Sequence, residues 1–148
     1  MKALSLWQPH SLAIALGLKT WETRDWPTRY RGPLAIHAAK RPWNDAGAWH
    51  ALAGILLTRR IQQAVAEALP EGLADERRIA ATALKKEWLV FGAVQCVVDL
   101  VDCVRTSELR GKLAPDVEFW GDFSDGETGK GRWAFKLENV RPLVVPLP

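Results

Sequence analysis

The sequence predicts an α+β domain built on a small, partly open β-barrel. About five or six short segments carry the alternating or β-branched pattern typical of strands, and turn residues separate them. Helical patterns gather in one insert, at about residues 46–88, instead of following each strand as a parallel α/β sheet requires. Because the 148 residues contain no internal repeat and no low-complexity linker, residues 1–148 are expected to form a single domain.

The N-terminal third is expected to contain three strands and one short helix. The helix covers residues 12–16, with Ser11 as its N-cap and Gly17 supplying the left-handed conformation that ends it. The strands are short, are bounded by Pro or Gly, and cover residues 3–6, 20–26 and 34–39.

The rest of the chain begins with the insert, where apolar residues at helical spacing predict two amphipathic helices. Cys96 and Cys103 fall on opposite faces of the longest expected strand, so no disulfide between them is expected. The remaining expected elements are that strand at 94–104, a polar Gly-rich loop at 106–131, a closing strand at 132–140 and an extended tail.

Charge and residue spacing limit the classes of partner. The net charge is only +3, but residues 1–43 hold seven Lys/Arg against two acidic residues. A basic N-terminal third is compatible with a polyanion, although an ordinary solvated surface explains it equally well. The three histidines lack the spacing of zinc sites, so no metal or cofactor is expected. No apolar run approaches the roughly 18 residues of a membrane span and no signal-like segment opens the chain, so a cytoplasmic protein without a membrane partner is expected.

The segment from Gly17 to Arg24 carries the strongest chemical signal. Gly17 allows a sharp turn after the helix, and Lys19 follows that turn. Glu22 and Arg24 are two residues apart on a strand, so they share a face. Such a group can bind a phosphate and a base edge, a desolvated Lys can act as a base or nucleophile, or the three charges can form a surface salt-bridge ladder. Spacing alone leaves these interpretations open.

The pattern Gly-x-Lys-x-x-Glu-x-Arg resembles the signature of the ASCH (activating-signal-cointegrator homology) domain family. The resemblance extends to Leu6-Trp7-Gln8-Pro9 before the motif and to the stretch from Trp26 to Ala38 after it. Gly92-Ala93-Val94 and the stretch from Trp133 to Val140 are similar to later strands of the family. The resemblance implies a PUA-like β-barrel with a cleft lined by the signature residues, and it implies binding of RNA, a nucleotide or a nucleoside.

The resemblance also implies two enzymatic alternatives. Some members of the family are amidohydrolases that act on N4-acetylcytidine, and others are ribonucleases. In the amidohydrolases a Lys of the motif works with a Thr and a Glu. Lys19 matches that Lys, but Glu22 stands at the position of the Thr. We assign the remote Glu to Glu108, with Glu118 as the second choice, so the expected catalytic residues are Lys19, Glu22 and Glu108.

Further ligand-contacting residues are expected around the cleft. Trp7, at a strand end, is placed to stack on a base of single-stranded RNA together with Gln8, with core packing of Trp7 as the alternative. Arg24 is expected to hold a phosphate or to lock the neighbouring Glu. His37 is either a general acid/base or a structural histidine, and Lys40 either guides a phosphate backbone or is plain surface charge.

Three functional hypotheses follow from these residues. The first is a binding module for RNA or a modified nucleoside, and the second is a small hydrolase that acts on N4-acetylcytidine-type nucleosides or on RNA. The third is an interaction domain that retains the cleft. Glu22 at the Thr position favours binding, whereas the grouping of Lys, Glu and Arg favours some catalysis. The sequence therefore favours binding narrowly and leaves the enzymatic question open.

Overall fold

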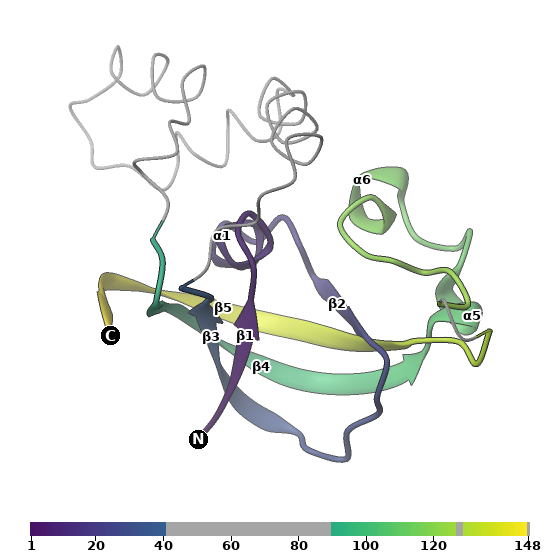
Figure 1. Cartoon of the computed structure of the whole chain (residues 1–148), viewed down its shortest axis with the longest axis horizontal. Coiled ribbons are helices and arrows are strands. Elements are labelled where there is room, and N and C mark those ends of the chain that lie inside the picture. Colours follow the sequence, from purple (N-terminus) through teal and green to yellow (C-terminus); the bar gives the residue numbers. More distant parts are fainter. Residues whose placement is uncertain (41–89, 127–128, 148) are drawn as a thin grey trace, which may run out of the picture.

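The computed structural model describes residues 1–40, 90–126 and 129–147, apart from the side chain of Asp116. In these ranges five strands form one curved sheet in the order β1-β3-β4-β5-β2 (Figure 1). The strands are β1 (Lys2–Leu6), β2 (Trp21–Arg24), β3 (Gly32–Ala38), β4 (Ala93–Arg105) and β5 (Trp133–Leu147). The helices are α1 (His10–Ala15), α5 (Thr106–Leu109) and α6 (Pro115–Glu118). The expected α+β class with a small, partly open barrel is confirmed, and the insert at 46–88 lies outside the described residues.

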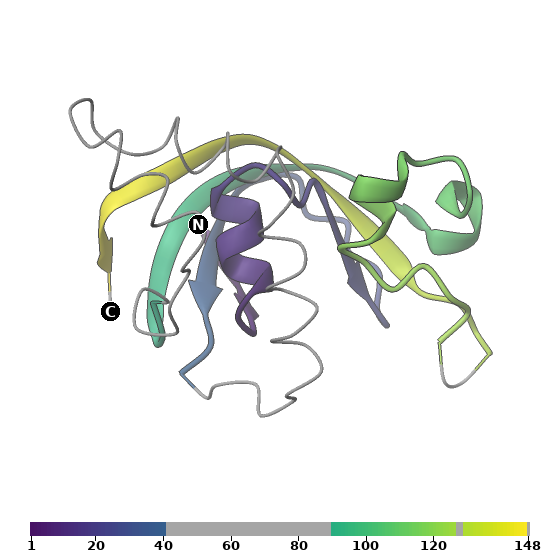
Figure 2. The same ribbon diagram turned by 90° about the horizontal axis from the view of Figure 1, so that it is seen from above.

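The sheet is antiparallel except for the pairing of β1 with β3, and β1 and β2 are its two edges. It arches over α1, which lies on the concave side (Figure 2). Register shifts interrupt the β4–β5 ladder at three places, and such bulges bend a strand and increase its twist. One bulge contains Asn139, which has a left-handed φ of 50° and donates a 2.9 Å hydrogen bond to Asp99 Oδ2.

The hydrophobic core lies between α1 and the concave face of the sheet. Ile14 of α1 and Ile36 of β3 are both completely buried there. Cys96 belongs to this core while Cys103 is half-buried, and both are free thiols, as their positions on the strand predicted. The core comprises Leu4, Leu6, Ile14, Leu34, Ile36, Cys96, Val98, Leu100, Phe135 and Leu137.

Three local predictions need correction. Helix α1 begins at His10 with Pro9 as its N-cap, and Ser11 makes no capping hydrogen bond because it already lies inside the first turn. The region at 106–131 is not all loop, because a capping box in which Glu108 accepts a hydrogen bond from the Arg105 N–H starts α5. The tail after Val140 continues β5, and Pro142 is tolerated there since β5 has a partner on only one side at that point.

The turn after α1 fixes the position of the Lys19 backbone. Gly17 has φ 71°, its N–H donates to the Ile14 carbonyl (2.9 Å), and the Leu18 N–H donates to the Ala13 carbonyl (2.8 Å). This is a Schellman motif, which satisfies the last carbonyls of the helix and reverses the chain. The N–H of Lys19 also donates to the Ala13 carbonyl (3.1 Å), so the backbone of Lys19 is tied to the helix end.

We expect Gly17→Ala to lower the free energy of unfolding by about 1 kcal/mol, because a residue with a Cβ is strained at positive φ. A Cβ at this position meets no heavy atom within 4 Å, so the loss reports backbone strain alone. Gly17→Asn should lose less, since Asn tolerates the left-handed conformation better. Urea unfolding measures both variants, and an unfolding free energy equal to the wild type for Gly17→Ala would contradict the role of this turn.

Candidate functional site

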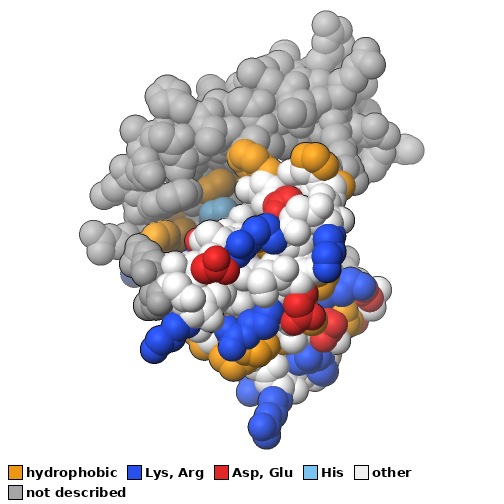
Figure 3. Space-filling view, turned by 90° about the vertical axis from the view of Figure 1, so that its right-hand side faces the viewer, with side chains coloured by type: hydrophobic (Ala, Val, Ile, Leu, Met, Phe, Trp, Pro, Cys, Tyr) orange, Lys and Arg blue, Asp and Glu red, His pale blue; other side chains and the backbone are white. Residues whose placement is uncertain are grey.

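A cavity of about 350 Å³ opens between the two edge strands of the sheet. The end of β1, the start of α1 and strand β2 form one side of it, and residues 119–122, which follow α6, form the other. Arg132, just before β5, completes the lining. Figure 3 views the molecule from the side of α5 and α6, where basic and acidic side chains lie next to one another on the surface.

The signature residues meet in this cavity as an ionic triad of Lys19, Glu22 and Arg24. Lys19 Nζ lies 3.1 Å from Glu22 Oε2, and Arg24 Nη2 lies 3.1 Å from Glu22 Oε1. Lys19 is only 2% exposed and Glu22 is 6% exposed. Lys19 also donates to the carbonyl of Trp120, and Arg24 Nη2 donates to the carbonyl of Ser5 (3.0 Å). The buried carboxylate is therefore shared by two cations, each of which also has a backbone acceptor.

Burial changes the acid–base properties of two cavity residues. Desolvation lowers the pKa of Lys19, Glu22 opposes this change, and the charges of Arg24 and Arg132 reinforce it. Burial, reinforced by the charges of Lys19 and Arg24, lowers the pKa of His10 from 6.5 to about 4. At neutral pH His10 is therefore uncharged, and the ammonium of Lys19 loses its proton more readily than a lysine in water.

The far wall of the cavity is aromatic at its centre. Trp120 is buried, and its ring meets the rings of Phe119 (5.6 Å between centroids) and His10 (6.3 Å) edge to face. The backbone N–H of Asp122 donates a hydrogen bond to the side-chain oxygen Oγ1 of Thr23 (3.0 Å), which connects this wall to β2.

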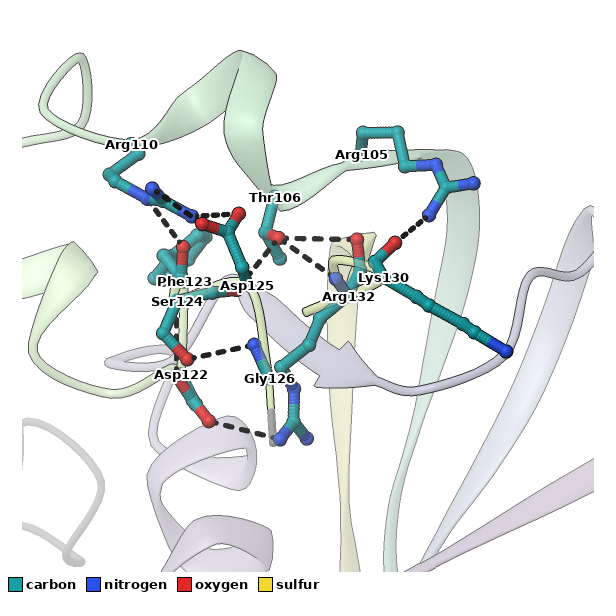
Figure 4. Close-up of polar contacts among 10 residues, drawn as sticks. All are labelled: Arg105, Thr106, Arg110, Asp122, Phe123, Ser124, Asp125, Gly126, Lys130 and Arg132. Atoms are coloured by element: carbon teal, nitrogen blue, oxygen red, sulfur yellow. Dashed lines mark hydrogen bonds and ion pairs between the residues drawn. The ribbon is translucent and has the colours of Figure 1, made fainter. Parts of the chain in front are cut away.

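Polar contacts hold the segment that carries this wall (Figure 4). The hydroxyl of Thr106, which is completely buried, lies 3.3 Å from the Ser124 carbonyl and 3.2 Å from the Arg132 carbonyl. Arg110 Nη2 lies 2.7 Å from Asp125 Oδ1, and Arg132 Nη1 lies 2.9 Å from Asp122 Oδ2. The contacts of Thr106 and Arg110 therefore connect α5 and the residue after it to residues 124–132, which lead into β5.

The structure brings four of the expected site residues together. Lys19, Glu22, Arg24 and Trp7 all line the cavity, and Trp7 is 55% exposed. His37 does not line it, but His37 Nδ1 lies 2.9 Å from the hydroxyl of Ser5, which does.

The other expected site residues lie outside the described cavity lining. Gln8 is completely buried, and its side-chain amide donates to the Val90 carbonyl (2.8 Å) and to Gln95 Oε1 (3.2 Å), which is a structural use of the amide. Glu108 is occupied as the cap of α5, and Glu118 Oε1 accepts from the Gly111 N–H (3.0 Å). Lys40 is exposed at the end of β3.

Several cavity residues escaped the sequence analysis because they lie in the region taken as loop or at its end. The succession Phe119-Trp120-Gly121-Asp122 was the available signal, since two adjacent aromatic residues are unusual in an otherwise polar, Gly-rich stretch. His10 was hidden because only tertiary packing places it beside Trp120. Arg132 carried no signal beyond its charge.

Comparison with known proteins agrees with the resemblance of the segment from Gly17 to Arg24 to the ASCH signature. The profile of the ASCH domain matches residues 4–119, which is more than half of the chain. The chain belongs to the ASCH domain family. The match includes the whole ionic triad and the first residue of the aromatic wall, whereas Arg132 lies beyond it. Among solved structures, this ASCH domain is similar to a mutant of the ZmASCH protein from Zymomonas mobilis, with 18% identity and a TM-score of 0.47 over 98% of this chain and 73% of that chain. No curated protein matches the chain.

The described ranges of this ASCH domain contain no group of three or more His, Cys, Asp or Glu side chains placed to hold a metal ion. Among the same residues, no helix is both long and apolar enough to cross a membrane.

The lowered pKa of His10 predicts a pH-dependent stability. Between about pH 6.5 and 4 the unfolded chain binds a proton at His10 and the folded chain does not, so acid favours the unfolded state. We expect the free energy of unfolding to fall over this window, by at most roughly 3 kcal/mol from this one residue. Urea unfolding at pH 7 and pH 4.5 measures the loss, and His10→Asn should reduce it. The same loss in His10→Asn would contradict the assignment.

Proposed function

We propose that this ASCH domain binds RNA or a modified nucleoside in the cavity between β1 and β2. The observation that carries the proposal is the combination of an ionic triad, in which Lys19 and Glu22 are buried and Arg24 is half-buried, with exposed aromatic side chains that line the same cavity. Trp7 and Phe119 each line the cavity and are each 55% exposed. A base needs both features, because its faces stack on aromatic rings and its edges form hydrogen bonds.

The size and chemistry of the cavity suit one nucleoside unit. A volume of about 350 Å³ lies at the lower end of the range for small-molecule sites. Glu22 lines the cavity as an acceptor for an exocyclic amino group, and neutral His10 offers a hydrogen-bonding group without charge. A base stacked at the margin would thus meet polar partners deeper inside.

Trp7→Ala tests the stacking role of the exposed indole. We expect the affinity for a short single-stranded RNA to fall by about tenfold to a hundredfold, because stacking of one base on an aromatic ring contributes about 1–3 kcal/mol. Fluorescence anisotropy with labelled RNA oligonucleotides measures the affinity.

Trp26→Ala is the matched control for this experiment. Trp26 is 49% exposed, so it is nearly as accessible as Trp7, but it packs on Phe135 (5.1 Å between ring centroids) and does not line the cavity. Its variant should bind RNA like the wild type. Equal losses in both variants would show that any exposed indole contributes, and no loss in Trp7→Ala would remove Trp7 from the site.

The state of Lys19 favours a second candidate, a hydrolase acting on N4-acetylcytidine-type nucleosides. A buried lysine with a lowered pKa can accept a proton from a water molecule that attacks an amide carbonyl. Hydrolysis would then break the bond between the acyl carbon and N4, and it would leave acetate and cytidine. Glu22, which contacts Lys19, is placed to orient the amine.

Mass-spectrometric detection of cytidine from N4-acetylcytidine tests this candidate. If the domain is an amidohydrolase, Lys19→Met should abolish product release while the wild type releases cytidine. Lys19→Met removes one of the two cations that contact buried Glu22, which can destabilise the fold. The double variant Lys19→Met/Glu22→Gln removes the carboxylate charge as well. Circular dichroism checks that both variants are folded. Release of cytidine that does not depend on Lys19 would exclude this mechanism. No release by the wild type would leave binding as the leading function and RNA cleavage as the enzymatic alternative.

A further inference from the structure

The charge of the cavity is unbalanced. Lys19, Arg24 and Arg132 contribute three positive charges to its lining, whereas Glu22 and Asp122 contribute two negative charges, and His10 is neutral at pH 7. The lining therefore carries a charge of +1. A partly enclosed site with a net positive charge favours a ligand that brings one negative charge.

Both arginines of the cavity retain unused donors. The Nη2 atom of Arg24 serves Glu22 and the Ser5 carbonyl, and the Nη1 atom of Arg132 serves Asp122 and, at 3.5 Å, Asp25. The Nε atom of each arginine is buried and has no hydrogen-bond partner within the described structure. These Nε atoms have almost no exposed surface, so a ligand in the cavity would instead meet Nη1 of Arg24 and Nη2 of Arg132, which take part in none of these contacts.

The two arginines lie at the same end of the β2–β5 ladder. Arg24 is the last residue of β2 and pairs with Trp133, and Arg132 is the residue that directly precedes Trp133, just outside β5. Arg24 and Arg132 also act on the same buried group, because the charges of both lower the pKa of Lys19. A guanidinium presents its donors in a planar fork that matches two oxygens of a phosphate.

We propose that Arg24 and Arg132 form a phosphate subsite of this cavity, so that the ligand is a nucleoside monophosphate or a phosphodiester in an RNA strand and not a free nucleoside. This inference rests on the proposed function, since it specifies which part of a nucleotide enters the site. Arg132 is then a specificity-determining residue, and Asp122 holds its guanidinium while the site is empty.

The first arm of the test compares ligands on the wild-type protein. Isothermal titration measures binding of the four ribonucleosides, their 5′- and 3′-monophosphates, a short single-stranded RNA and inorganic phosphate. Charge-assisted hydrogen bonds predict that at least one monophosphate binds on the order of tenfold or more tightly than its nucleoside. Tight binding of the RNA but of neither monophosphate would identify the phosphodiester as the source of the phosphate.

The second arm uses variants that change the subsite in opposite directions. Arg132→Gln should lower monophosphate affinity much more than nucleoside affinity, so that the preference for phosphate is lost, and the dependence of RNA affinity on salt should weaken by about one counterion. Asp122→Asn should tighten monophosphate binding, because it removes one negative charge from the lining, and an Asn side chain can still accept the hydrogen bond from the Ser124 N–H. A purely structural role of the Arg132–Asp122 pair predicts weaker binding in both variants.

Arg110→Gln is the matched control. Arg110 forms a comparable ion pair with Asp125 in the same segment, but it does not line this cavity. Its variant should keep the preference for phosphate, and loss of that preference would show that Arg132 acts by holding the segment in place. Equal affinity of the wild type for nucleosides and their phosphates, together with an RNA affinity that Arg132→Gln leaves unchanged, would overturn the subsite while leaving the proposed function intact. Binding of no nucleoside, nucleotide or RNA would instead overturn the proposed function.

Discussion

The shared burial of Lys19 and Glu22 is the constraint on which the rest of the site depends. Removing two charges from water is costly, and the cost is recovered only when each charge has partners of good geometry. The fold supplies two such partners, Arg24 on the same strand as Glu22 and the carbonyl of Trp120 from the opposite wall, and the turn at Gly17 positions the backbone of Lys19. Strand β2, the turn after α1 and the segment that carries Trp120 therefore all contribute to holding this ion pair.

The same burial gives the cavity its chemistry. Trp120 lies against His10 and covers Lys19, and desolvation is the largest cause of the lowered pKa of both residues. The wall that carries Trp120 depends in turn on β2, because Thr23 accepts the hydrogen bond from Asp122. Strand β2 thus presents Glu22 and Arg24 to the cavity and anchors, through the residue between them, the segment that shields them.

The strands and the triad could be predicted because they follow local rules. Alternation located β3 and β4, and the strand period placed Glu22 and Arg24 on one face. The position of the aromatic wall could not be predicted, since α5 and α6 are single turns whose placement depends on polar contacts between distant residues such as Thr106 and Arg132. Gln8 was predicted to contact a ligand, because it is a polar residue next to Trp7 at a strand end. Its actual hydrogen-bond partners, Val90 and Gln95, are more than eighty residues away in the sequence, so no local pattern indicates them.

The open seam of the barrel has a mechanical consequence. Strands β1 and β2 are the edges of the described sheet, and they are joined across the cavity by the hydrogen bond from Arg24 to the Ser5 carbonyl instead of a backbone ladder. A ladder separates only when several hydrogen bonds break together, whereas this bridge is one side-chain hydrogen bond whose guanidinium is also held by Glu22. Among the described residues, the closure of this seam is thus tied to the same ion pair that fills the cavity, and a change at Glu22 would reach the edge of the barrel as well as the site.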